Sequence, residues 1–286
     1  MTDLPSGLRH ALAETLDVLG TGVAAEVKGG RGVRRLALQL QDGETAELVV
    51  MRGQNGRTAC VSSQVGCPVG CTFCASGILG LARNLECWEI LEQFLHARQL
   101  GPFDRAVFMG TGDPALNAAQ VINAIHVLTD PAHGLGIAPR RITLSTATGP
   151  ARIRSLARVG RPVGLAISLH AAVDELRAEL VPSQAGVAID DLVVAALDYR
   201  DRTGGALTIE YVLLAGVNDG EDAAASLARR IADRPFFINL IPYNPVDGMP
   251  YERPLSETSH AFKTVLERAG LRVRIRQSQG RDVDAA

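Results

Sequence analysis

Two kinds of hydrophobic pattern alternate along the chain from Ala59 onward. Short, nearly continuous apolar runs are typical of parallel strands buried on both faces, and longer segments with apolar residues every three or four positions are typical of amphipathic helices. The predicted strands are 59–62, 106–109, 141–145, 163–169, 207–213, 236–241 and 272–276. The predicted helices are 88–100, 117–128, 151–159, 190–202, 220–232 and 257–269.

The segment 88–100 has the clearest helical pattern. Its apolar positions share one face and comprise Ile90, Leu91, Phe94 and Leu95. We expect the polar residues Glu89, Glu92 and Gln93 to lie mostly on the other face, as in a surface helix.

The alternation of strands and helices predicts an α/β fold with a parallel sheet and right-handed crossovers. The number and spacing of the strands suit an incomplete (β/α) barrel better than an eightfold one. In such barrels the working residues lie at the C-terminal ends of the strands.

The first 56 residues have a different pattern. A helix is predicted at 8–19, followed by strands at 35–40 and 47–52, and Asp42-Gly43 between these strands is typical of a hairpin turn. We therefore expect a small N-terminal α+β accessory domain over 1–56, connected through 53–56 to a barrel core over 57–286.

The composition is that of a globular protein, with 47% hydrophobic and 21% charged residues among 286. Residues 1–20 lack the basic and apolar regions of a secretory signal, and the chain contains no apolar run of the roughly 18 residues that a membrane span needs. We expect a cytoplasmic protein with no membrane partner.

The net charge of −2 gives no overall attraction to nucleic acid, but arginines cluster locally. Lys28 and Lys263 are the only lysines among the 29 lysine and arginine residues, and the rest are arginine. Codon usage would produce this bias toward arginine, and so would phosphate binding. One group comprises Arg140, Arg141, Arg152, Arg154, Arg158 and Arg161, and a second comprises Arg272, Arg274, Arg276 and Arg281. Either an RNA contact or a solvated charged face fits these groups.

Five cysteines are present, and Cys67, Cys71 and Cys74 follow the first predicted barrel strand with CxxxCxxC spacing. Thiolates are ligands of iron–sulfur clusters and of zinc. Three ligands favour a cluster, which leaves one iron free to bind a cofactor, whereas a structural zinc site needs a fourth ligand, such as Cys60. Buried structural thiols are a third alternative. Cys87, at the start of a predicted helix, is expected to be structural.

The CxxxCxxC spacing is typical of the radical-SAM superfamily, and further segments resemble its RlmN/Cfr family of RNA methyltransferases. The matching segments, in chain order, are 60–67, 110–117, 142–146, 165–171, 181–182, 209–213, 217–220 and 238–245. Their shared order and spacing make the resemblance specific over residues 47–286.

The resemblance implies one 4Fe–4S cluster bound by Cys67, Cys71 and Cys74, and S-adenosylmethionine as the second cofactor. The implied cofactor-binding residues are Gly112, Asp113, Ser145, Ser168, Leu169, His170 and Asn244. Glu47 would be the proton acceptor, and Cys60 would resolve a covalent enzyme–RNA intermediate. The implied substrate is adenosine in ribosomal or transfer RNA, methylated at carbon 2 or carbon 8, and an electron donor such as flavodoxin or ferredoxin is implied as a partner.

Each of these residues also has a structural alternative. Asp113, before Pro114, could be only a turn residue, and the Ser145 hydroxyl could cap local backbone. His170 and Cys60 could be buried core residues, and Glu47 could be an exposed strand carboxylate.

The sequence departs from the family pattern at two places. Asp113 replaces the usual glutamate, which shortens the side chain by one methylene. Residues 280–286 match the segment that leads to the family's methyl-carrying cysteine, which would follow Ala286. We therefore expect residues 1–286 to cleave S-adenosylmethionine slowly without methylating RNA. A radical-SAM enzyme acting on a small molecule or peptide is the main alternative, and a zinc-stapled binding domain is the third.

Overall fold

The computed structural model describes residues 4–15, 19–53, 56–78 and 80–276. Within these segments, a sheet has the strand order β1-β2-β3-β4-β7-β8-β9-β10-β11-β12, and β5 pairs with β6 in a separate ribbon. The N-terminal strands are β1 (Gly22–Lys28), β2 (Arg34–Gln39), β3 (Thr45–Gly53), β4 (Gly56–Val61), β5 (Gln64–Gly66) and β6 (Leu81–Asn84). The others are β7 (Arg105–Phe108), β8 (Ile142–Thr146), β9 (Gly164–Ser168), β10 (Leu207–Leu213), β11 (Phe236–Pro242) and β12 (Arg272–Ile275).

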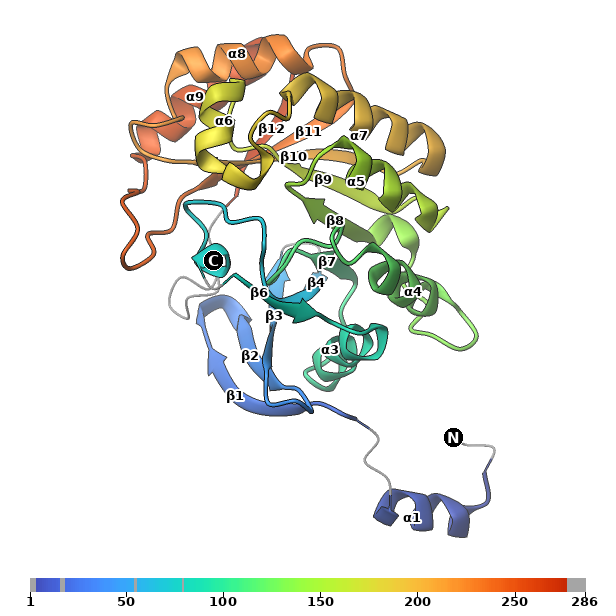
Figure 1. Ribbon diagram of the computed structural model, residues 1–286. Coiled ribbons are helices and arrows are strands. Elements are labelled where there is room, and N and C mark those ends of the chain that lie inside the picture. Colours follow the sequence, from blue (N-terminus) through green and yellow to red (C-terminus); the bar gives the residue numbers. More distant parts are fainter. Residues whose placement is uncertain (1–3, 16–18, 54–55, 79, 277–286) are drawn as a thin grey trace.

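Every strand pair from β4 through β7 to β12 is parallel, which confirms the predicted α/β class. The helices between these strands follow the outer side of the curved sheet (Figure 1). The longer ones are α3 (Cys87–Gln99), α4 (Ala118–Thr129), α7 (Ile189–Thr203), α8 (Glu221–Ile231) and α9 (Ser256–Arg268). Two shorter helices, α5 (Pro150–Leu156) and α6 (Asp174–Leu180), also lie between parallel strands. The helix α2 (Ala75–Ile78) lies between β5 and β6, and α1 (Ser6–Thr15) precedes β1 and lies apart from the sheet (Figure 1).

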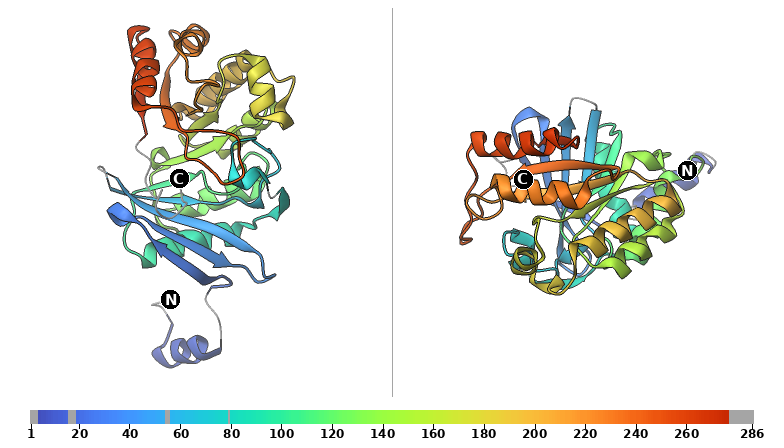
Figure 2. Two further views of the ribbon diagram at one scale, coloured as in Figure 1. Left: turned by 90° about the vertical axis from the view of Figure 1, so that its left-hand side faces the viewer. Right: turned by 90° about the horizontal axis from the view of Figure 1, so that it is seen from above.

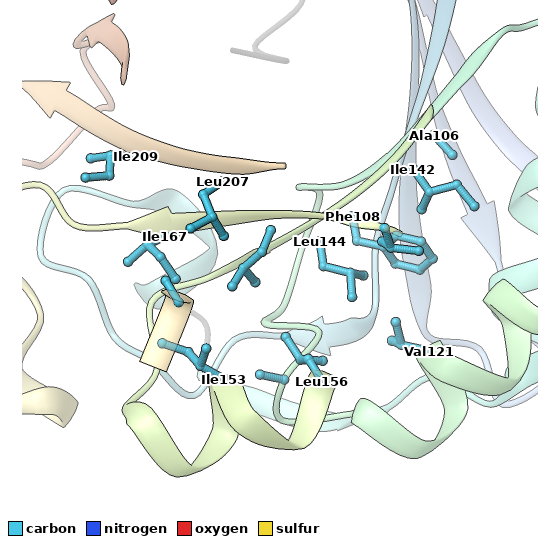
Figure 3. Close-up of a cluster of buried hydrophobic side chains, with 14 of the residues drawn as sticks. Ala106, Phe108, Val121, Ile142, Leu144, Ile153, Leu156, Ile167, Leu207 and Ile209 are labelled. Carbon is cyan, nitrogen blue, oxygen red and sulfur yellow. The ribbon is translucent and has the colours of Figure 1, made fainter. Parts of the chain in front are cut away.

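The main core lies between the strands and these helices (Figure 3). Phe108 and Leu144 on the strands are buried, as are Val121 on α4 and Ile153 and Leu156 on α5. Burying one such side chain contributes about 1.5–3 kcal/mol. This core fixes the strands in place, so the loops at their C-terminal ends rest on a rigid base.

The sheet curves until its distant strands approach each other across its inner face, the face opposite these helices. Arg276, directly after β12, places its Nη2 atom 3.9 Å from the sulfur of Met51 on β3. The backbone amide of Arg276 still bonds to Leu240 of β11. The predicted incomplete barrel of parallel strands is therefore confirmed.

The N-terminal strands extend the same sheet with antiparallel pairs (Figure 2). The predicted hairpin turn joins β2 to β3, and Gly43 takes a positive φ of 87° there, which suits glycine. Of the helix predicted at 8–19, α1 is described to Thr15. The division into domains at residue 56 stays a prediction, and the predicted tail segment 280–286 lies outside the described residues.

The predicted polar face of α3 is wrong, because Glu89, Glu92 and Gln93 are buried whereas Leu95 is 39% exposed. Glu92 accepts hydrogen bonds from the backbone amides of Gly20 and Thr21. Gln93 bonds to both the amide and the carbonyl of Ser62, and Glu89 pairs with Arg83. The partners of Glu92 and Gln93 come from distant parts of the chain, and Arg83 lies on β6 just before the helix, so helical periodicity alone could not reveal them.

No helix in the described segments is long and apolar enough to cross a membrane.

Candidate active site

The cysteine loop follows β4 and β5 at the C-terminal edge of the parallel strands. Gly66 has a φ of 75°, and a side chain there would collide with the carbonyl of Gly80. The amide of Cys67 bonds to that same carbonyl at 2.7 Å, and the amide of Cys74 bonds to the carbonyl of Cys71 at 3.1 Å. Glycine at position 66 therefore lets the loop fold back closely enough to gather its cysteines.

A cavity of about 210 Å³ brings this loop together with the C-terminal ends of the barrel strands. Predicted site residues in its lining are Cys67, Cys71, Cys74, Gly112, Asp113, Ser145, Ser168 and His170. Further lining residues include Phe73, Met109, Thr146, Ala147, Glu210, Ile241 and Arg276. Residues predicted from separate segments thus share one site.

Asp113 is buried in this cavity's wall, and four hydrogen bonds hold its carboxylate. One oxygen accepts from the amide of Ala115 at 2.9 Å and the other from the amide of Ala147 at 2.8 Å. The Thr146 hydroxyl lies 2.8 and 3.0 Å from the two oxygens. Burial raises the pKa of Asp113, and these hydrogen bonds oppose the rise because they stabilise the anion.

Gly112 allows the loop before Asp113 to lie against Gln64. It has a φ of 97°, and an added Cβ would lie 2.6 Å from the Gln64 side chain. The Gln64 side-chain oxygen accepts the backbone amide of Asp113 at 2.8 Å. Gln64 thereby fixes the position of the backbone at 112–113, and Gly112 and Asp113 both line the cavity.

Two serines and a histidine continue the wall on neighbouring strands. The hydroxyls of Ser145 and Ser168 lie 3.1 Å apart. Burial, together with the Arg177 charge, lowers the pKa of His170 to about 3, so the imidazole is neutral near pH 7. Its Nδ1 accepts the amide of Val212 at 3.1 Å, and its ring packs edge-on against Phe73.

Two predicted cofactor residues lie outside the cavity lining. The side chain of Leu169 is buried in the main core. The side-chain oxygen of Asn244 lies 3.4 Å from Arg253. Their predicted roles stay predictions.

The three loop thiols are held in a largely apolar setting with Val69, Phe73 and Tyr243. Burial raises the pKa of Cys67 to about 11, and it raises the pKa of Cys71 as well. Both are therefore protonated near pH 7 unless a metal displaces the proton. In the described segments no three acidic, histidine or cysteine side chains converge as ligands of a single ion.

Cys60 and Glu47 lie on the inner face, beside the cavity rather than in its lining. Cys60 packs in a separate apolar cluster with Val33 and Val49, and Met109 connects this cluster to the cavity. Burial raises the pKa of Cys60 to about 11. Glu47 on β3 is half-buried and pairs with Arg35 at 2.9 Å. The register of β3 and β4 places Glu47 and Cys60 on the same face of the sheet.

The chain is similar in sequence to known proteins. Residues 61–228 match the Radical SAM superfamily. A relative from Rhodopirellula baltica, named "Probable dual-specificity RNA methyltransferase RlmN", is 44% identical over all of this chain and 78% of its own length. A relative of the same name from Symbiobacterium thermophilum is 41% identical, again over 100% of this chain and 78% of its own length. The chain belongs to the RlmN family of radical SAM methyltransferases.

A solved structure agrees with this assignment. The crystal structure of a radical SAM methyltransferase from Sphaerobacter thermophilus has a TM-score of 0.92 and 38% identity to this chain. It is matched over 100% of this chain and 85% of its own chain. Members of the superfamily use S-adenosylmethionine and a 4Fe–4S cluster, so both cofactors belong to the family chemistry of this protein.

Within this RlmN-family fold, sequence reasoning missed several residues of the site. Glu210 lines the cavity and accepts a hydrogen bond from Asn239 at 2.7 Å. Burial raises the pKa of Glu210, while Asn239 and Arg276 oppose the rise. An acid inside the apolar run 207–213 was a visible sequence signal for it. Gln64 and Thr146 gave no comparable signal, because hydroxyl and amide side chains are common at strand ends.

Proposed function

We propose that the protein transfers a methyl group from S-adenosylmethionine to a ring carbon of adenosine in ribosomal or transfer RNA. The observation that carries this proposal is the single cavity shared by the three loop cysteines and by Asp113, Ser145, Ser168 and His170. Membership of the RlmN family makes an RNA substrate a better proposal than the small-molecule or peptide alternative.

In this proposal Cys67, Cys71 and Cys74 hold a 4Fe–4S cluster. The residues fit such a group because three thiols border one cavity, and because two nitrogens of the buried Arg177 have no hydrogen-bond partner in the part of the chain that the structure describes. Cys60, the candidate fourth zinc ligand, packs in a different cluster. When bound and reduced, the cluster supplies the electron that cleaves S-adenosylmethionine.

The cavity wall would hold the methionine part of S-adenosylmethionine. Asp113 would accept its ammonium, and its four hydrogen bonds from the chain fix the carboxylate in place for that purpose. A neutral His170 avoids repulsion with the sulfonium. The hydroxyls of Ser145 and Ser168 would take the cofactor's polar groups, and Leu169 and Asn244 keep their proposed contacts to it.

Glu47 and Cys60 would act on the RNA base beside the cavity. Glu47 would remove the ring proton, and its ion pair with Arg35 directs the carboxylate over the inner face. Cys60 would form a disulfide with the methyl-carrying cysteine of the covalent intermediate. The bond from that sulfur to the RNA-bound carbon would break, and its electron pair would take up a proton to complete the methyl group. Because its thiol has a raised pKa, Cys60 needs a base, and the charge of Arg276, which lowers that pKa, favours the thiolate.

The remaining partners follow from this chemistry. An electron donor such as flavodoxin or ferredoxin would reduce the cluster, and RNA would lie across the inner face. We also propose that the protein acts in the cytoplasm, where its RNA substrates are made.

Mass spectrometry of RNA tests the proposal. Reconstituted, reduced protein is incubated with RNA and methyl-labelled S-adenosylmethionine, as residues 1–286 and as the same chain with a cysteine-containing tail after Ala286. We expect labelled methyladenosine from the extended form, and none from its Cys60→Ala variant. Cleavage of S-adenosylmethionine by both forms without any labelled RNA would favour a non-RNA substrate.

A further inference from the structure

Helix α6 places an arginine behind the cysteine loop. The carbonyl of Leu180, at the end of α6, accepts the amide of Thr72 at 3.0 Å, which ties this helix to the loop between Cys71 and Cys74. The side chain of Arg177, on the same helix, is 1% exposed. A guanidinium is rarely buried without a paired anion.

The buried guanidinium of Arg177 makes few hydrogen bonds with the described residues. Its Nη2 donates to the carbonyl of Ala147 at 2.8 Å, but its buried Nε and Nη1 have no hydrogen-bond partner among the described residues. The charge of Asp174 acts on Arg177, but Asp174 forms its ion pair with Arg230, at 3.4 Å, and Asp190 pairs with Arg230 at 3.0 Å. A buried charge that is only partly compensated is destabilising, so a further anion near Arg177 would be stabilising.

The loop thiols are candidates for that anion. Ala147, whose carbonyl accepts the Arg177 Nη2, lines the same cavity as Cys71 and Cys74. Iron binds cysteines as thiolates, so a cluster in this cavity would bring negative charge close to Arg177.

We propose that Arg177 is the buried counter-charge of the iron–sulfur cluster, positioning its thiolates and raising its reduction potential. This inference rests on the proposed cluster at Cys67, Cys71 and Cys74. The cluster with its thiolates carries net negative charge, and reduction adds one electron to it. A fixed cation behind the loop stabilises the reduced form more than the oxidised form, because the Coulomb energy grows with the charge it faces. Nearby charge and hydrogen bonds to sulfur are known means of setting cluster potentials.

Three variants test the proposal through the potential of the reconstituted cluster. Arg177→Met removes the charge and keeps much of the side-chain length, Arg177→Lys keeps the charge, and Arg230→Met removes a matched arginine that has carboxylate partners. We expect Arg177→Met to make reduction about tenfold less favourable, which for a one-electron couple is a midpoint about 59 mV more negative. Arg177→Lys should lie closer to the parent protein, and Arg230→Met should match it.

The thermal unfolding of cluster-free protein gives a second readout. Because Arg177 forms no ion pair with any described residue when the cluster is absent, Arg177→Met should unfold at a temperature no lower than the parent protein. An unchanged potential in Arg177→Met, or loss of its fold without the cluster, would overturn the inference. Failure of the parent protein itself to take up iron and sulfide would instead refute the proposed cluster.

Discussion

The Nη2 atom of Arg276 lies 3.9 Å from the sulfur of Met51 across the inner face of the sheet. Arg276 directly follows β12 and Met51 is on β3, two strands that are far apart in the strand order. Arg276 also lines the cavity, and its charge acts on both Glu210 and Cys60. The pairing of β11 with β12 puts Arg272 and Arg274 on the same face as Arg276, beside Phe237 and Asn239 of β11. A row of arginines therefore leads from solvent to the proposed reaction site.

This row predicts a salt-dependent interaction with RNA. Replacing the exposed Arg274 with Gln should reduce the slope of log affinity against log salt by about 0.7, the value for one phosphate contact of a single strand. Arg268→Gln, on the exposed C-terminal end of α9, is the control and should leave the slope unchanged. Equal slopes for parent protein and Arg274→Gln, measured by fluorescence anisotropy, would place the RNA elsewhere.

Asp113→Asn tests the cofactor site. It keeps the shape of the side chain but removes the charge that would pair with the ammonium of S-adenosylmethionine. A charge-assisted hydrogen bond contributes about 1.5–3 kcal/mol, so we expect a roughly ten- to hundredfold weaker affinity by calorimetry of cluster-containing protein. Iron content should stay at the parent level, and Thr264→Ala on α9 serves as the control. An unchanged affinity for S-adenosylmethionine would contradict the assignment of Asp113 to the binding site.

His170 predicts an acid-dependent loss of stability. Its pKa falls from 6.5 to about 3 on folding, so the unfolded chain binds a proton that the folded chain refuses between these values. The free energy of unfolding is therefore unaffected by protonation of His170 above pH 6.5. It decreases as the pH falls toward 3, by on the order of a few kcal/mol. His170→Asn keeps a hydrogen-bond acceptor and tolerates the positive φ of 61°. Denaturant unfolding of this cluster-free variant should show a smaller loss between pH 7 and pH 4; the same loss as in the parent protein would contradict the assignment.

Gln93→Leu tests the buried polar contacts of α3. The change leaves the amide and carbonyl of Ser62 without their partner in a buried position. Leaving buried polar groups unpaired costs about 1–3 kcal/mol each, so for these two groups we expect a loss of stability of about 2–6 kcal/mol by urea unfolding. Leu95→Gln, at an exposed position of the same helix, should change stability by less than about 0.5 kcal/mol. Similar stabilities for the two variants would mean that these contacts contribute little.

Much of the fold could be predicted because its strands are buried on both faces. The run 207–213 was predicted with the bounds that β10 has, since it is mostly apolar and is flanked by Gly205 and Gly216. Strand β1 was missed because it lies at the sheet edge with every residue exposed, so its sequence shows no pattern of burial. The polar side of α3 was misassigned because its partners lie outside the helix, at Thr21 and Ser62 far away in sequence and at Arg83 on β6.

The site divides in the same way. Cysteine spacing and family resemblance identified Cys67, Cys71, Cys74 and Asp113, which line one cavity. Arg177 could not be found, because a charged helix with Asp174, Glu175 and Glu179 nearby predicts a solvated arginine. Its burial depends on how α6 packs against the cysteine loop, which is a tertiary property.

The most direct test of the central claim is to measure 5′-deoxyadenosine formed from S-adenosylmethionine by anaerobically reconstituted, reduced protein. The account predicts product together with a broad absorbance near roughly 400 nm from thiolate-bound iron. Cys67→Ala, Cys71→Ala and Cys74→Ala should each abolish both signals, and Cys87→Ala at the start of α3 should keep both. Stoichiometric zinc without sulfide, or product formation that survives Cys71→Ala, would contradict the account.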